Sequence, residues 1–193
     1  MLSYFSLCSD GVLTVTEKGI ELLGDPTETA LVAASYQFGD TKQELAKQFE
    51  RCGELAFDSD RKMMTVFFKI SDGILQITKG APDVIVSRCV GNTEGVLDAT
   101  EQMADSALRV LACGVRYYPE MPDLQNGTDY ETNLTFVGLV GMIDPPRLEV
   151  KDAIREAKSG GIKTVMITGD HLVTARAIAR ELGIYEEGDE AIT

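Results

Sequence analysis

Residues 161–171 have the sequence Gly-Ile-Lys-Thr-Val-Met-Ile-Thr-Gly-Asp-His, in which an apolar run ends abruptly in a hydroxyl, a glycine and a carboxylate. Residues 162–167 have the length and branching of a buried parallel strand, and residues 172–182 have helical spacing that Gly183 closes. The polar residues 168–170 therefore follow the carboxyl end of a predicted strand, where open α/β sheets bind ligands. This pattern is typical of one half of a phosphoryl-transfer site.

A second strand–helix unit precedes this one. Residues 136–143 form another apolar strand pattern that ends in Asp144, and a helical pattern runs from beyond Arg147 to Gly160 and Gly161. Strand–helix–strand–helix order predicts parallel pairing of the two strands. The polar residues that follow both strands are then expected at one edge of the same sheet.

The first part of the chain has a different pattern, with helix caps and closely spaced strands. Residues 12–23 predict a hairpin-like start. Asp25 as N-cap, Pro26 at the first helical position and Glu28 as the capping-box carboxylate predict a helix that ends near Gln37.

Further elements are predicted as far as residue 132. Thr41, followed by Glu44 three residues later, begins a second helix, and Pro82 begins a third. The predicted strands are residues 53–57, 63–70, 73–78 and 109–117, with a turn at 71–73, a helical segment at 99–108 and a polar loop at 119–132. We interpret this loop as a linker between two domains.

Together these patterns predict an α/β protein of the α+β type. Residues 1–133 are expected to form an antiparallel sheet with flanking helices. Residues 134–193 are expected to form a second, incomplete unit with parallel strands.

Composition excludes several classes of protein. The chain is 44% hydrophobic, yet no apolar run approaches the roughly 20 residues that cross a bilayer, so we expect no direct membrane contact. The N-terminus lacks a basic segment followed by a sustained apolar core, so we expect no signal peptide and a soluble, cytosolic chain. A net charge of −13 without a basic stripe argues against nucleic acid as a partner.

The cysteines and the histidine predict no metal site. Cys8, Cys52, Cys89 and Cys113 lie far apart without paired metal-ligand spacing, which indicates reduced, partly buried thiols rather than zinc ligands or disulfides. His171 is the single histidine in the sequence, which excludes most histidine-rich metal sites and a Ser-His-Asp triad. We interpret it as a surface residue at a helix start.

Six motifs, in order, resemble those of the cation-transporting P-type ATPases, specifically the branch that contains calcium pumps. One such motif would be a weak signal, whereas six in order over nearly the whole chain are a strong one. The motifs lie at residues 24–31, 57–64, 78–82, 109–111, 144–147 and 168–170.

The resemblance implies a nucleotide-binding domain at residues 1–133 and part of a haloacid-dehalogenase-like Rossmann phosphorylation domain at 134–193. It implies ATP and ADP as ligands, with Mg²⁺ in the parent protein, which hydrolyses ATP through an aspartyl phosphate to move a cation. Calcium is the ion that the motifs favour. The implied partners are the rest of the phosphorylation domain, the actuator domain and the transmembrane domain of a pump, at the cytoplasmic face of a membrane.

The resemblance also assigns nucleotide contacts in the first domain. It implies Phe57 as the adenine platform, with Met64 at the pocket wall, and Lys79 with Gly80 at the pocket floor. Lys62 shares the motif of Phe57. The residues alone also allow ordinary roles, with Phe57 facing the core, Met64 filling apolar space and Lys62 solvated at a strand edge.

The remaining assignments concern the base edge and the phosphates. Glu28 is implied at the adenine amino edge, although the capping box explains it without a ligand. Arg109 is implied at the phosphate or ribose side, against an ordinary role in a surface ion pair. Asp144 and Arg147 face the phosphates in the family, although a helix N-cap and a first-turn arginine explain them structurally.

In the family, the second domain would supply the phosphoryl site. Thr168, Gly169 and Asp170 lie beside the phosphorylated carboxylate there, with the threonine hydroxyl donating to the transferred group. The family's Asp-Lys-Thr-Gly-Thr run and its later Gly-Asp-Gly segment do not occur in this sequence. We therefore expect an excised cytosolic piece that binds nucleotide without turning it over.

Two further departures follow from the resemblance. Ser59 stands where related calcium pumps often carry an arginine that contacts phosphates, so weaker discrimination of triphosphates is expected. The second unit lacks the strand that carries the nucleophile, which leaves a sheet edge open. That half is then either loosely ordered or paired with another copy.

Two alternative functions stay open at this point. A small phosphatase of the haloacid-dehalogenase type could use Asp58 and Asp60 as nucleophile and acid–base pair, with Thr168 binding phosphate. Against it, Lys62 occupies the position where that motif has threonine, and nothing after Asp170 supplies magnesium ligands. A non-catalytic interaction module has only the acidic surface in its favour.

Overall fold

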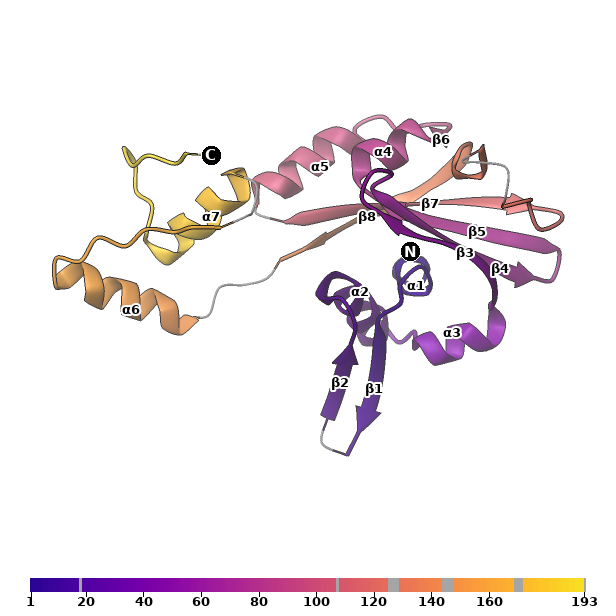
Figure 1. The fold of residues 1–193 in the computed structure, drawn as a ribbon, viewed down its shortest axis with the longest axis horizontal. Coiled ribbons are helices and arrows are strands. Elements are labelled where there is room, and N and C mark those ends of the chain that lie inside the picture. Colours follow the sequence, from indigo (N-terminus) through magenta and orange to yellow (C-terminus); the bar gives the residue numbers. More distant parts are fainter. Residues whose placement is uncertain (18, 107, 125–128, 144–147, 169–171, 193) are drawn as a thin grey trace. The chain divides into compact units, whose positions relative to one another are not determined.

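The computed structural model describes residues 1–17, 19–106, 108–124, 129–143, 148–168 and 172–192. It divides into two compact units, one of Met1–Leu97 with Leu111–Val140 and one of Asp98–Val110 with Gly141–Thr193. The predicted domain boundary after residue 133 stays a prediction. Figure 1 shows the elements of both units.

A six-stranded sheet with the order β3-β4-β5-β7-β8-β6 organises the first unit. β3, β4, β5 and β7 pair antiparallel in succession, and β6 pairs parallel with β8. The predicted mixed α/β class is confirmed. The strands are β3 (Glu50–Asp58), β4 (Met63–Ile70), β5 (Gly73–Gly80), β6 (Cys89–Val90), β7 (Arg109–Tyr118) and β8 (Leu134–Met142).

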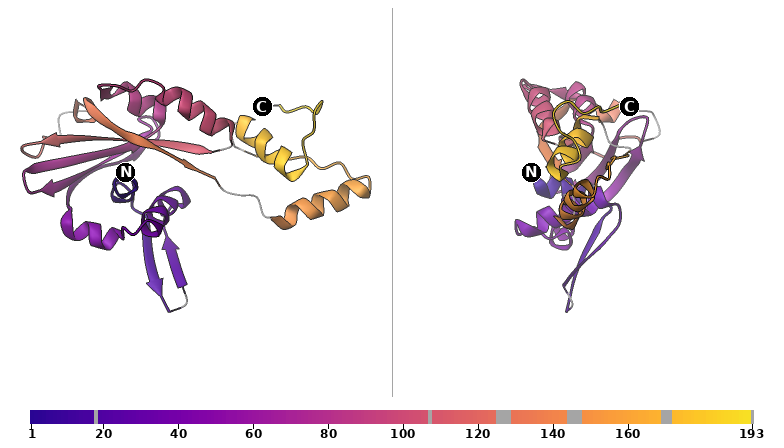
Figure 2. Two further views of the ribbon diagram at one scale, coloured as in Figure 1. Left: turned by 180° about the vertical axis from the view of Figure 1, so that it is seen from behind. Right: turned by 90° about the vertical axis from the view of Figure 1, so that its left-hand side faces the viewer.

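Helices cover both faces of this sheet, as Figures 1 and 2 show. α1 (Leu2–Leu7) and α2 (Pro26–Gln37) lie on one face, where Val66 and Ile77 are fully buried cross-strand partners. α4 (Pro82–Ser87) lies on the opposite face, where its Ile85 packs against Met63 and Ala112. Because successive residues of a strand point to opposite faces, the burial of consecutive residues shows that β4 and β5 are covered on both sides.

The predicted helix caps of the first unit form. Asp25 Oδ1 accepts from the backbone amides of Thr27 and Glu28 at the start of α2, and Thr41 Oγ1 accepts from the amide of Glu44 at the start of α3 (Lys42–Gln48). Each cap satisfies amides that have no partner within the helix. The predicted hairpin is also present, as β1 (Val12–Thr16) paired antiparallel with β2 (Gly19–Leu23).

The second unit is mainly helical among the described residues. α5 (Val96–Asp105) spans the junction of the two ranges, and α6 (Leu148–Ser159) and α7 (Leu172–Leu182) follow. Lys158 Nζ forms an ion pair with Glu186 at 2.6 Å, and the Arg176 and Arg180 guanidinium groups lie over the Tyr185 ring. None of the helices in the described ranges has the length and apolar character that a bilayer crossing needs.

The parallel strand predicted at residues 162–167 is wrong. These residues have no strand structure, and Ile162, Val165 and Ile167 are 63, 68 and 93% exposed. A strand requires a neighbour for its backbone amides and carbonyls, and within the described ranges no strand pairs with this segment. An apolar run without a pairing partner does not form a strand and stays exposed.

Candidate functional site

A tight turn links β3 to β4 and presents Phe57. The Phe57 side chain is 65% exposed, so it does not face the core. Asp58 Oδ1 accepts from the amides of Asp60 and Arg61 at 2.9 Å, and these backbone hydrogen bonds, led by that of Arg61, lower the Asp58 pKa. Asp58 therefore shapes the turn, which gives it a structural role in place of the nucleophilic one considered for a phosphatase.

The turn is held against the end of β5 by Gly80. Lys62 has a left-handed φ of 54°, and its carbonyl accepts from the Ala81 amide at 3.0 Å. A Cβ atom on Gly80 would lie 2.5 Å from that carbonyl oxygen, so a side chain there would force the two segments apart. Because Gly80 has no side chain, the motifs at residues 57–64 and 78–82 can lie side by side.

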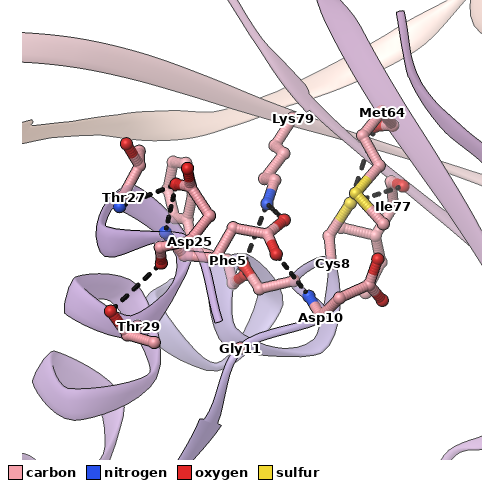
Figure 3. A network of polar contacts seen from close by, with 12 residues as sticks. Phe5, Cys8, Asp10, Gly11, Asp25, Thr27, Thr29, Met64, Ile77 and Lys79 are labelled. Carbon is pink, nitrogen blue, oxygen red and sulfur yellow. Dashed lines mark hydrogen bonds and ion pairs between the residues drawn. The ribbon is translucent and has the colours of Figure 1, made fainter. Parts of the chain in front are cut away.

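Lys79, next to Gly80 in the sequence, forms an ion pair with Glu28. Figure 3 shows Lys79 within the surrounding polar network. Lys79 Nζ lies 2.6 Å from Glu28 Oε1 and 3.0 Å from Ser9 Oγ, and Lys79 is 6% exposed. Glu28 Oε2 accepts from the Asp10 amide at 2.9 Å. The structure thus joins two predicted site residues that are 51 positions apart in the sequence.

The capping-box role predicted for the Glu28 carboxylate is wrong. Both of its oxygens are used by Asp10 and Lys79, and the N-cap is supplied by the Asp25 side chain alone. The local spacing was right for a capping box, but a buried ammonium is a stronger partner for a carboxylate than an exposed backbone amide.

Met64 lies opposite Lys79 in the β4–β5 register and is 2% exposed. The Cys8 thiol contacts the carbonyls of Met64 and Ile77 at 3.5 and 3.4 Å. Burial raises the pKa of Cys8 to about 11, so the thiol stays protonated at neutral pH. This environment suits the apolar packing role of Met64, and its role as a pocket wall stays a prediction.

The other predicted site residues belong to the second compact unit or lie outside the described residues. Arg109 begins β7, is exposed and belongs to the second compact unit, and Thr168 is exposed in that unit. Asp144, Arg147, Gly169 and Asp170 lie outside the described residues. In the described part of the chain, no three or more His, Cys, Asp or Glu side chains are arranged to hold a metal ion.

Sequence reasoning missed Glu131, which contacts the turn from the other face of the sheet. Glu131 is fully buried and accepts from Arg61 Nη1 at 2.5 Å. The available signal was the pair of polar residues Thr65 and Thr78 within apolar strands, since buried hydroxyls require partners. Thr65 Oγ1 donates to Glu131 Oε1 at 2.7 Å.

A family model and individual relatives both indicate the same protein family for this chain. Residues 1–149 match the family described as "P-type ATPase, cytoplasmic domain N". Calcium-transporting ATPase 1 of Bacillus cereus is 46% identical over 178 residues, covering 85% of this chain and 20% of the relative. Calcium-transporting ATPase 1 of Lactococcus lactis is 39% identical over 213 residues, covering 100% of this chain and 23% of the relative.

A relative named for different ions widens the comparison. The sodium/potassium-transporting ATPase subunit alpha-1 of Catostomus commersonii is 33% identical over 218 residues, covering 96% of this chain and 21% of the relative. The chain thus spans about a fifth of the length of these curated relatives. On the match over residues 1–149, this chain belongs to the P-type ATPase family.

Proposed function

We propose that this chain binds ATP and ADP at the edge formed by the β3–β4 turn and the end of β5. The observation that carries the proposal is the Lys79–Glu28 pair at the end of β5, where Gly80 adjoins the turn that follows the exposed Phe57 ring. Three motifs that are separate in the sequence contribute to this one edge. Ligand sites combine aromatic and apolar lining with a few placed polar groups, and here Phe57 supplies the aromatic group and Lys79 and Glu28 the polar ones.

Each residue has a chemical role in this proposal. Phe57 stacks on the adenine, a contact worth about 1 to 3 kcal/mol per base. Glu28 accepts from the adenine amino group, and Lys79 and Gly80 form the pocket floor with Met64 at its wall. Because a carboxylate has four acceptor positions and uses two here, Glu28 can accept from a ligand without losing Lys79.

The phosphates require cations against an overall charge of −13. Lys62, in the turn beside Gly80, is our candidate at this edge for a cation that contacts the phosphates. Arg109 is proposed at the phosphate or ribose side. With so few local cations we expect modest, salt-sensitive affinity.

The activity of the whole protein is also a proposal. We infer an ion-translocating ATPase at the cytoplasmic face of a membrane, in which Thr168, Gly169 and Asp170 stabilise the transferred phosphoryl group of ATP–Mg²⁺. Asp144 and Arg147 are proposed at the junction that faces the phosphates. The actuator, transmembrane and remaining phosphorylation domains would be the partners.

Calcium is the proposed cation, because several relatives are named calcium-transporting. The sodium/potassium relative at 33% identity shows that a similar domain N also serves a pump with another ion in its name. The ion assignment is therefore carried by the degree of identity, not by any residue of the site.

The experiment is a titration of the 193-residue chain with ATP, ADP and AMP, with and without Mg²⁺, followed by amide NMR shifts and by released phosphate. We expect all three to bind near the millimolar range, about −4 kcal/mol, with shifts at residues 28, 57–64 and 79–80 and no phosphate release. No shifts at this edge would refute the proposal. Phosphate release abolished by Asp58→Asn would support a phosphatase instead.

A further inference from the structure

A buried carboxylate lies on the face of the sheet opposite Lys79. Glu131, in the short 3-10 helix η1 (Asp129–Glu131), accepts through Oε1 from Arg61 Nη1 and from Thr65 Oγ1. Its Oε2 is buried without a hydrogen-bond partner in the described part of the structure. Thr65 is hydrogen-bonded to Thr78, which precedes Lys79 on β5. Because successive strand residues point to opposite faces, Thr65, Thr78 and Glu131 lie on the face opposite the Lys79 side chain.

The backbone around Glu131 is fixed by side chains from other elements. Tyr118 Oη donates to the carbonyl of residue 130 at 3.1 Å. Arg88 Nη1 donates to the carbonyl of residue 131 at 3.2 Å, and Arg116 Nη1 to that of residue 132 at 2.9 Å. Glu131 therefore projects from a backbone that three side chains anchor, within the segment that the sequence predicts as a linker.

Arg61 connects Glu131 to the turn that carries Phe57. Its second terminal nitrogen, Nη2, donates to Ala56 O at 2.6 Å, so one guanidinium bonds both Glu131 and the strand end just before Phe57. A guanidinium is planar and holds its donors in fixed directions. The next residue, Lys62, has a φ that few non-glycine residues adopt, so its conformation depends on the contacts around it.

We propose that Glu131 is a positioning residue for nucleotide binding. Through Arg61 it holds residues 56–62 in the conformation that exposes Phe57 and places Lys62 beside Gly80. Glu131 is fully buried, so it acts through Arg61 and not on the ligand. This inference rests on the proposed nucleotide-binding function of that edge.

Because Glu131 is charged, a positioning role and a purely electrostatic role predict opposite changes in ATP affinity when the charge is removed. Glu131→Gln keeps the size and one acceptor oxygen but removes a negative charge, so electrostatics alone predicts tighter binding of anionic ATP. Loss of positioning predicts weaker binding. The weakening should appear for uncharged adenosine as well as for ATP, since the base platform serves both.

The test measures ATP and adenosine affinity, and hydrogen exchange of the turn amides, in the 193-residue chain. For Glu131→Gln we expect roughly tenfold weaker binding of both ligands and faster exchange at residues 58–62 without ligand. Arg61→Lys keeps the charge but lacks the planar fork whose two terminal nitrogens bond Glu131 and Ala56 separately, and it should give the same result. The double variant should bind no more weakly than either single variant.

Ile77→Val is the matched control, because Ile77 is fully buried on the opposite face of β5. It should lower stability while leaving both affinities unchanged. Unchanged affinity in a folded Glu131→Gln chain, or an equal loss in Ile77→Val, overturns the positioning role and leaves the proposed function intact. Should Glu131→Gln fail to fold, Arg61→Lys decides the question in the same way.

The proposed function fails separately, if the unaltered chain binds neither ATP nor adenosine. Exchange at residues 58–62 then still decides whether Glu131 holds the turn, since that measurement needs no ligand. Unaltered exchange in both Glu131→Gln and Arg61→Lys would overturn the link between Glu131 and the turn.

Discussion

Two segments with similar apolar sequences have different fates in this chain. β5 in the first unit is hydrogen-bonded to β4 and β7, and its Ile77 is fully buried. Residues 162–167 in the second unit are just as rich in apolar and branched residues, but they form no strand, and Ile167 is 93% exposed. An apolar run thus specifies where a strand can form, whereas a paired neighbour decides whether it does.

The same substitution in both segments gives the largest expected difference. Ile77→Ala removes packed methyl groups from the core and should cost about 2 to 5 kcal/mol of the free energy of unfolding. Ile167→Ala should change it by no more than about 0.5 kcal/mol, because the side chain is already in water. Urea unfolding followed by circular dichroism measures both, and a large loss in Ile167→Ala would show that residues 162–167 are packed after all.

The comparison also shows what the sequence could and could not predict. Most elements of the first unit were predictable because their signals are local, as with Asp25 before α2 and Thr41 before α3, whereas α1 and β6 were not predicted. The role of Glu28 was mistaken because its strongest partner, Lys79, is brought to it only by the fold. Local spacing cannot show which distant ammonium competes for a carboxylate.

The candidate site was predictable only in part, for a similar reason. The motif resemblance drew attention to Phe57, Lys79 and Gly80, and the register of β4 and β5 brings the two motifs together. Thr65 and Thr78 indicate that a buried partner exists but do not identify Glu131, because a carboxylate in a polar loop has the sequence pattern of a solvated residue. Its burial depends on Arg61 and Thr65, more than 60 positions away.

The buried Lys79–Glu28 pair gives the next largest effect. Lys79→Met should cost about 3 kcal/mol, because it leaves the Glu28 carboxylate without its charged partner. Lys69→Met removes an exposed ion pair with Glu50 and should leave unfolding nearly unchanged. Both are measured by urea unfolding.

A second substitution checks this explanation. Replacing both members of the pair, as Lys79→Met with Glu28→Leu, should recover much of the stability, because no unpaired charge is then buried. A double variant less stable than Lys79→Met alone would contradict the account of this pair.

The burial of Cys8 in the first unit predicts a pH dependence. Its folded pKa of about 11 lies above the ordinary value of 9.0, so the unfolded chain loses this proton first as the pH rises. The resulting stabilisation is complete below pH 9 and is lost between about pH 9 and 11, at up to about 1.4 kcal/mol per pH unit.

To test this pH dependence, the free energy of unfolding is measured against pH in Cys8→Ala and in the unaltered chain, and the two slopes are compared. The variant should lose less stability between pH 9 and 11 than the unaltered chain, whatever its starting stability. Cys52→Ala, at a half-buried thiol, should change the slope less. Equal slopes in Cys8→Ala and the unaltered chain would show that Cys8 is not protected by the fold.

The most direct test of nucleotide binding compares two exposed phenylalanines by measuring ATP affinity. Phe57 is 65% exposed at the proposed site, and Phe38, the C-cap residue that follows α2, is 80% exposed. We predict that Phe57→Ala weakens ATP binding about tenfold through the loss of stacking, whereas Phe38→Ala leaves it unchanged. Equal ATP affinity in Phe57→Ala and the unaltered chain would contradict the assignment of this edge as the nucleotide site.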